Sequence, residues 1–132
     1  MSFIELSGLN EVTEKKLLKE GRYELLIESA KVKKNENTGK SNILVVLAAE
    51  GQDNTANILH NVPLPNPDDE PETKSFKMLL IKRFLVQFGI NFADGNVNTE
   101  AFSGSRGTCN VTVDEYEGRH SNKLVLDPLP QG

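Results

Sequence analysis

The segment that decides the fold covers residues 71–89 and reads PETKSFKMLLIKRFLVQFG. At about 100° per residue, a helix places five of its apolar side chains on one face. These are Leu80, Ile81, Phe84, Leu85 and Phe88. Pro71 suits a first helical turn, where its missing N–H is not needed, and Gly89 suits the end of a helix. The segment therefore predicts a helix whose apolar face is buried against the rest of the chain.

Two segments before this helix have the pattern of β-strands. In residues 21–34 the apolar side chains change parity between Ile27 and Ala30, which predicts a β-bulge near Glu28 or Ser29. Residues 33–42 have the Asn, Gly and Ser content of a turn. Residues 43–49 are apolar at both parities, so we expect a strand that is covered on both faces. The two strands should form a hairpin.

A third strand is expected over residues 55–62, with Asn57, Leu59 and Asn61 on a side that faces water or a ligand. The proline-rich residues 63–73 then predict a stiff loop into the helix. After the helix, residues 98–104 predict one helical turn with Asn98 or Thr99 as its N-cap. Strands around 108–113 and 123–127 should follow, joined by a turn that reads DEYEGRHSN.

The order of the expected elements is strand, strand, strand, helix, strand, strand. This is the order of the oligonucleotide/oligosaccharide-binding fold, or OB-fold, a five-stranded barrel with its helix between strands three and four. We therefore predict an all-β fold with one main helix, and a single domain over residues 1–132. Residues 1–20 should form an irregular arm with one helical turn near Thr13 to Leu18, and residues 128–132 a short tail.

Composition limits the classes of function. The net charge of −4 is the wrong sign for holding DNA by bulk charge, so a nucleic-acid site would be a local patch. No apolar run approaches the roughly 20 residues needed to cross a bilayer, and the first residues do not resemble a secretory signal. Cys109 is the one cysteine, so the chain has no internal disulfide. These features predict a cytoplasmic protein, in the host cell if the protein is viral.

The residue types needed for catalysis are sparse. His60 and His120 belong to different elements, without a neighbouring Cys or carboxylate at the spacing of metal ligands. Cys109 has the parity of a buried side chain on its strand, which favours an inert thiol. The sequence contains no phosphate-binding glycine loop and no nucleophile elbow. We expect no enzyme, no metal site and no cofactor.

Binding of single-stranded nucleic acid has better candidates. In an OB-fold, the loop between strands one and two and the loop between strands four and five flank the ligand groove. The expected site residues on these loops and on the polar side of the third strand are Lys33, Lys34, Lys40, Asn61, Tyr116, Arg119, His120 and Lys123. Cations would contact phosphates and Tyr116 would stack on a base. Because Glu36, Glu115 and Glu117 share these loops, a mixed solvated surface is the alternative.

Two motifs add a resemblance to a known family. Residues 17–34 read LLKEGRYELLIESAKVKK, and residues 111–124 read VTVDEYEGRHSNKL. Together with the proline-rich connector they resemble small single-stranded DNA-binding proteins encoded by bacteriophages. The resemblance spans about residues 17–127 and implies an OB-fold that coats single-stranded DNA in phage DNA replication or recombination, without sequence preference. The tail lacks the acidic tip by which many bacterial single-strand binders recruit partners.

Other functions and partners stay open at this stage. A structural or protein-interaction adaptor could use the same barrel as a scaffold, because a fold does not specify a function. Apolar residues outside the main helical face, Phe76, Leu79 and Val86, would suit a protein interface or packing of the N-terminal arm. Single-stranded RNA as a ligand and a homo-oligomeric state also remain alternatives, whereas no membrane partner is expected.

Overall fold

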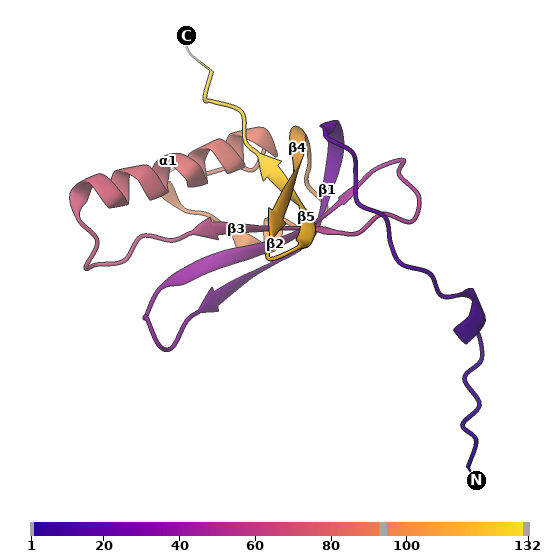
Figure 1. Cartoon of the computed structure of the whole chain (residues 1–132). Helices are drawn as coiled ribbons and strands as arrows, with labels where there is room; N and C mark the ends of the chain where they lie inside the picture. The colour runs from indigo at the N-terminus through magenta and orange to yellow at the C-terminus, as the bar shows by residue number, and fades with distance from the viewer. Residues whose placement is uncertain (1, 93–94, 131–132) are drawn as a thin grey trace.

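The computed structural model describes residues 2–92 and 95–130 of the chain, which form one antiparallel sheet and one long helix (Figure 1). The strands are β1 (Gly21–Lys34), β2 (Ser41–Ala49), β3 (Ile58–Pro63), β4 (Arg106–Tyr116) and β5 (Arg119–Val125). The helix α1 (Pro71–Gln87) lies between β3 and β4, and short 3-10 turns cover Leu9–Glu11 (η1) and Thr99–Ala101 (η3). The predicted order of strands and helix is confirmed.

The five strands are hydrogen-bonded in the order β3-β2-β1-β4-β5. β1 is long enough to pair with β4 through residues 21–26 and with β2 through residues 25–34. The change of partner coincides with a register shift between Ile27 and Ser29, where the bulge was predicted. β3 and β5 are in contact, but among the described residues no ladder of hydrogen bonds joins them. The sheet is therefore open, and the prediction of a closed barrel is not confirmed.

The helix packs its apolar face on the sheet, as the sequence predicts. Phe84, Leu85 and Phe88 are buried, whereas Leu80 and Ile81 are only half-buried. The C-terminal end of α1 lies against β4. A Cβ atom at Gly107 would come within 2.6 Å of the Gln87 carbonyl oxygen, so the close packing of helix and strand needs a glycine there.

A polar cluster joins the end of α1 to β1 and to the segment after β5. The Arg22 guanidinium donates to Asp127 at 2.7 Å, and the Gln87 amide donates to the same carboxylate at 3.0 Å. The hydrogen bonds from Arg22 and then Gln87 lower the pKa of Asp127 to about 2. These contacts hold the segment after β5 against the helix.

The N-terminal arm differs from the prediction. The single helical turn is η1, and not residues 13–18, because the segment near Lys16 is extended along residues 54–56. The Lys16 N–H donates to the Asn54 carbonyl oxygen, and the Ala56 N–H donates to the Lys16 carbonyl oxygen, both at 2.9 Å. These backbone bonds use donors and acceptors that a helical turn would have needed.

Smaller differences concern coverage and element ends. β3 begins at Ile58 instead of residue 55, and the outer side chains of β2 at positions 44, 46 and 48 are half-buried, so β2 is not fully covered on both faces. Asn98 is the N-cap of η3 as predicted, since its side chain accepts from the Glu100 N–H. No helix within residues 2–92 and 95–130 is long and apolar enough to span a membrane.

Candidate functional site

A groove runs along the seam between the two edge strands, β3 and β5. It consists of two adjoining hollows of about 340 and 330 Å³ that share Leu59 and Lys123. The first is lined by Leu17, Ala56, Asn57, Leu59, His120, Ser121, Asn122 and Lys123, and the second by Leu59, His60, Asn61, Lys123 and Leu124. We call this feature the β3–β5 groove. It includes three of the residues predicted from sequence: Asn61, His120 and Lys123.

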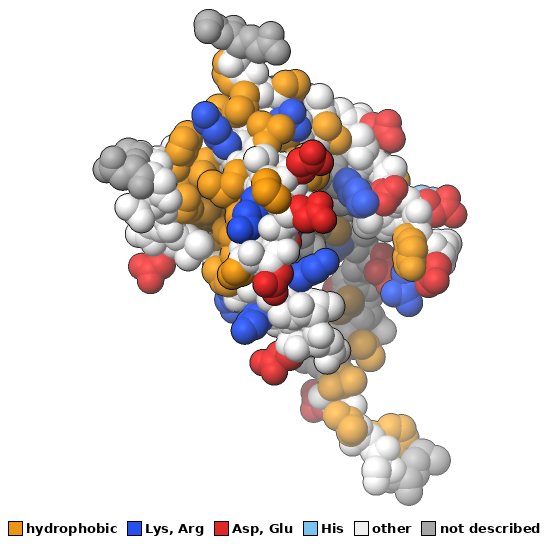
Figure 2. All heavy atoms as spheres, turned by 90° about the vertical axis from the view of Figure 1, so that its left-hand side faces the viewer, with side chains coloured by type: hydrophobic (Ala, Val, Ile, Leu, Met, Phe, Trp, Pro, Cys, Tyr) orange, Lys and Arg blue, Asp and Glu red, His pale blue; other side chains and the backbone are white. Residues whose placement is uncertain are grey.

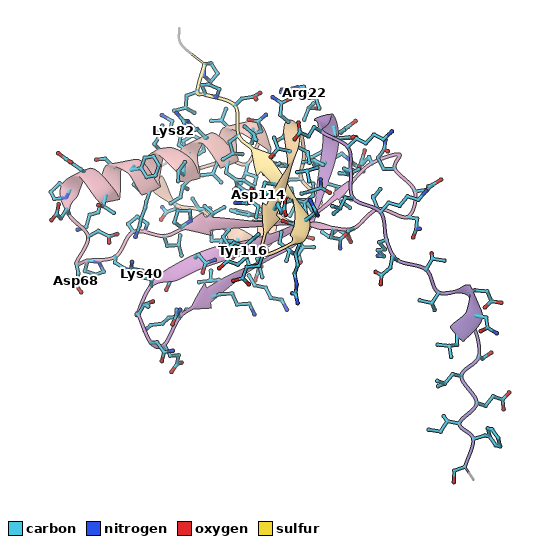
Figure 3. All side chains as sticks on the ribbon, in the orientation of Figure 1. Arg22, Lys40, Asp68, Lys82, Asp114 and Tyr116 are labelled. Carbon is cyan, nitrogen blue, oxygen red and sulfur yellow. The ribbon has the colours of Figure 1, made fainter. Side chains whose placement is uncertain are left out.

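The two strands run in the same direction along the groove. Residues 56–57 share one hollow with residues 120–121, and residues 60–61 share the other with Leu124. β3 ends beside the β1–β2 hairpin, since Pro63 pairs with Asn42, whereas β5 begins at the β4–β5 turn. The hairpin and the turn therefore lie at opposite ends of the groove. The predicted basic residues flank it and do not form one cluster, as the separation of Lys40 and Tyr116 shows (Figure 3).

The hairpin is the positive end of the groove. Residues 31–42 contain four lysines and one glutamate, and Lys33, Lys34 and Lys40 are exposed. Lys33 pairs with Asn42, whose side-chain amide donates to Asn61, so the three residues share the outer face of the sheet. The side chain of Lys34 points to the opposite face of the sheet, because successive residues of a strand alternate between faces. Lys31, opposite Leu44, is a further cation on the outer face that was not predicted as a site residue.

The β4–β5 turn forms the other end. Glu117 and Gly118 both have positive φ, 51° and 77°, which is typical of a two-residue type I′ hairpin. The turn is therefore much shorter than the predicted loop, and Arg119, His120 and Lys123 lie on β5. The register places Arg119 directly opposite Tyr116, whose side chain is 74% exposed. A flat ring and a guanidinium thus face solvent side by side.

Carboxylates of β4 offset part of the positive charge on β5. Lys123 Nζ lies 2.9 Å from Asp114 Oδ2, and His120 Nε2 lies 3.6 Å from Glu115 Oε2. These pairs are largely exposed, and such pairs contribute little to stability. In the part of the chain that the structure describes, no salt bridge is formed by Lys33, Lys34, Lys40 or Arg119. All four side chains are exposed, and Lys40 also interacts electrostatically with Asp69.

The groove also has apolar side chains that sequence reasoning did not select. Leu59 is 61% exposed and contributes to both hollows, and Leu17 lies beside it in the first. Leu59 alternates with Asn57 and Asn61, which suggested a polar face. A large apolar residue at a solvent-facing position was the available signal, because nothing in the chain's own core needs it there.

Asn122 is the buried polar residue of the groove wall. Its carbonyl oxygen accepts from the Leu18 N–H, and its amide donates to the Leu18 carbonyl oxygen, both at 2.9 Å. The Asn122 side chain thereby satisfies the backbone N–H and carbonyl oxygen of Leu18, as a neighbouring strand would. Leu18 is buried as a result, and the arm next to Leu17 has a defined position at the edge of the groove.

The remaining reactive side chains are structural. His60 stacks on Phe84 with ring centroids 5.6 Å apart, and its burial lowers its pKa to about 4. Cys109 is fully buried, and burial raises the pKa of its thiol to about 12. Within the described residues, no three His, Cys, Asp or Glu side chains are placed to bind a metal ion.

Comparison with known proteins adds no relative. No protein-family model matches the chain, and no curated protein sequence is significantly similar to it. The interpretation of the groove therefore depends on its geometry and charge.

Proposed function

We propose that this protein binds single-stranded DNA along the β3–β5 groove, without strong sequence preference and without catalysis. The observation that carries the proposal is a groove with exposed lysines at one end and an exposed tyrosine opposite an arginine at the other. In the cell, such a protein would coat single strands during phage DNA replication or recombination, as the resemblance of its motifs implies.

The topology supports this proposal. The sheet order β3-β2-β1-β4-β5, with α1 between β3 and β4, is compatible with a partly open OB-fold. In that fold, oligonucleotides bind across the face of strands two and three, between the loops that join strands one and two and strands four and five. The β3–β5 groove lies beside this face, and the β1–β2 hairpin and the β4–β5 turn lie at its two ends. We propose that the chain is an OB-fold that is open at this seam.

The charges support a ligand that follows the groove from end to end. The chain as a whole is negative, so phosphates would be attracted locally to Lys33, Lys34 and Lys40. At the opposite end Arg119 can contact another phosphate. Lys123 between them can exchange its exposed pairing with Asp114 for a phosphate oxygen at little cost.

Bases need flat or apolar partners, and the groove offers two. Tyr116 is exposed at the turn, and Leu59 is exposed in the middle. Stacking of a base on an aromatic side chain contributes about 1 to 3 kcal/mol and tolerates every base, because each base has a π-face. Asn57 and Asn61 add hydrogen-bonding groups along the same strand. These contacts would give affinity without a strict sequence requirement.

The proposal is tested by titrating oligo-dT at several salt concentrations, with duplex DNA and single-stranded RNA as competitors. Replacing Lys33 or Lys31 with Gln should lower affinity and reduce the salt slope by about 0.7 for each phosphate contact that is lost. Tyr116→Ala should lower affinity by about 1 to 3 kcal/mol while leaving the slope nearly intact. Lys82→Gln is the matched control, because Lys82 lies on α1 away from the groove (Figure 3).

Two outcomes would contradict the proposal. Unchanged affinity after combined replacement of Lys33, Lys34, Tyr116 and Arg119, with the fold intact, would exclude this site. A complete lack of salt-dependent binding to oligo-dT would instead favour the alternative of a protein-interaction adaptor. The exposed apolar side chains of α1, such as Phe76 and Met78, are the observation that supports that alternative.

A further inference from the structure

The N-terminal arm exposes apolar side chains that have no place in the core. Phe3, Ile4, Leu6, Leu9 and Val12 are between 60% and 88% exposed. The arm extends away from the sheet, on the side of the molecule that is opposite to α1 (Figure 1). The base of the arm is held, because Lys16 is bonded to Asn54 and Ala56, and Leu18 is bonded to Asn122. An arm with this composition buries apolar surface only when it finds a partner.

A second apolar surface lies on α1. A groove of about 220 Å³ lies beside the helix, and it is lined mainly by Met78, Ile81, Leu85, Phe92 and Val97. Met78 is 57% exposed and Val97 is 38% exposed. Figure 2 views the molecule from the end where α1 begins and shows a band of hydrophobic side chains with basic and acidic side chains beside it. We call this feature the α1 groove.

The charges of the arm and of the α1 groove are complementary. Lys74 and Lys82 lie four residues before and after Met78, so the three side chains follow one side of the helix. Lys82 also lines the groove. Residues 2–12 of the arm contain Glu5 and Glu11 and no Lys or Arg. Glu5 lies between Ile4 and Leu6 in the sequence, so the arm carries a carboxylate directly beside its apolar side chains.

We propose that the arm of one copy binds in the α1 groove of a second copy. Phe3, Ile4 and Leu6 enter the apolar groove, and Glu5 faces the lysines on either side of Met78. Because two different surfaces meet, the contact is heterologous, so copies either close into a ring or extend as a chain. This self-association requires no nucleic acid and is independent of the β3–β5 groove.

The test is the concentration dependence of the mass of the full chain, measured by sedimentation equilibrium without DNA. The wild-type protein should associate, and the double arm variant Phe3→Ser, Ile4→Ser should raise the dissociation constant about tenfold or more. The groove variant Met78→Glu should have a similar effect. Val125→Ser is the matched control, because Val125 is exposed but lies on β5, outside both surfaces.

A mixing experiment separates arm exchange from other modes of association. The arm variant retains an intact groove and the groove variant retains an intact arm, so an equimolar mixture should form heterodimers although each variant alone stays monomeric. If Met78→Glu fails to fold, Lys82→Glu replaces it. A wild-type chain that is monomeric throughout, including one whose arm folds back on its own groove, overturns the proposal. So does a mixture that does not associate, or an arm variant that associates like the wild type.

Discussion

Replacement of Phe84 by alanine should be the most damaging single truncation in the helix. Phe84 is fully buried and lies at the centre of an aromatic cluster. Its ring centroid is 4.8 Å from that of Phe88, 5.6 Å from that of His60 and 5.7 Å from that of Phe102. The cluster joins α1 to β3 and to the segment before β4, so surrounding elements are constrained from collapsing into the space that the ring leaves.

Buried Phe to Ala substitutions cost about 3 to 5 kcal/mol, and the three ring contacts place Phe84 near the middle of that range or above it, at about 4 kcal/mol. Urea unfolding followed by circular dichroism should show this as a fall in the midpoint of roughly 2 M. Because a small domain has only about 5 to 15 kcal/mol in total, Phe84→Leu is the companion variant, with an expected cost of about 2 kcal/mol.

A second readout tests the same contact through His60. The ring of Phe84 shields His60 from water, so its removal should raise the pKa of His60 from about 4 toward the usual 6.5, measured by NMR titration. Phe76→Ala is the control on the same helix, because Phe76 is 59% exposed and its loss should cost less than about 0.5 kcal/mol. A cost below about 1 kcal/mol for Phe84→Ala would refute the packing described for α1.

Two further predictions concern buried polar groups. His60 has a pKa of about 4 in the folded protein against about 6.5 unfolded, so the unfolded chain binds more protons at acid pH. The stability that depends on a neutral His60 is complete above pH 6.5 and is lost as the pH falls through 4. In urea unfolding, the free energy of unfolding of the wild type relative to that of His60→Gln should therefore fall by roughly 3 kcal/mol over that range. A constant difference would contradict the assigned burial. Asn122→Leu should cost about 1 to 3 kcal/mol, because the Leu18 N–H and carbonyl oxygen lose their partners. Amide exchange near Leu18 should accelerate in that variant, and unchanged protection would show that the arm is held by other contacts.

Local sequence patterns were sufficient for the order of the strands and the helix and for the bounds of β1 and α1, whereas β3, β4 and β5 begin or end several residues from the predicted positions. The 3.6-residue period of residues 71–89 and the parity change near Glu28 are properties of neighbouring residues, so they predicted α1 and the bulge directly. The exposure of Tyr116 was predicted for the same reason, since a large aromatic in a turn has little to pack against. The tight two-residue turn was not predicted, because Glu117 adopts a positive φ that its residue type does not favour.

Only the tertiary structure decided how these elements are placed relative to one another. The groove exists because β3 and β5, which are far apart in sequence, approach each other without closing the ladder, and pattern reasoning about a barrel assumed closure. The position of the arm depends on the long-range bonds between Leu18 and Asn122, which no local period encodes. The sequence by itself determined which side chains could bury or bind, because those are properties of residue type and spacing. Their grouping at the two ends of a groove required the packing of the whole sheet.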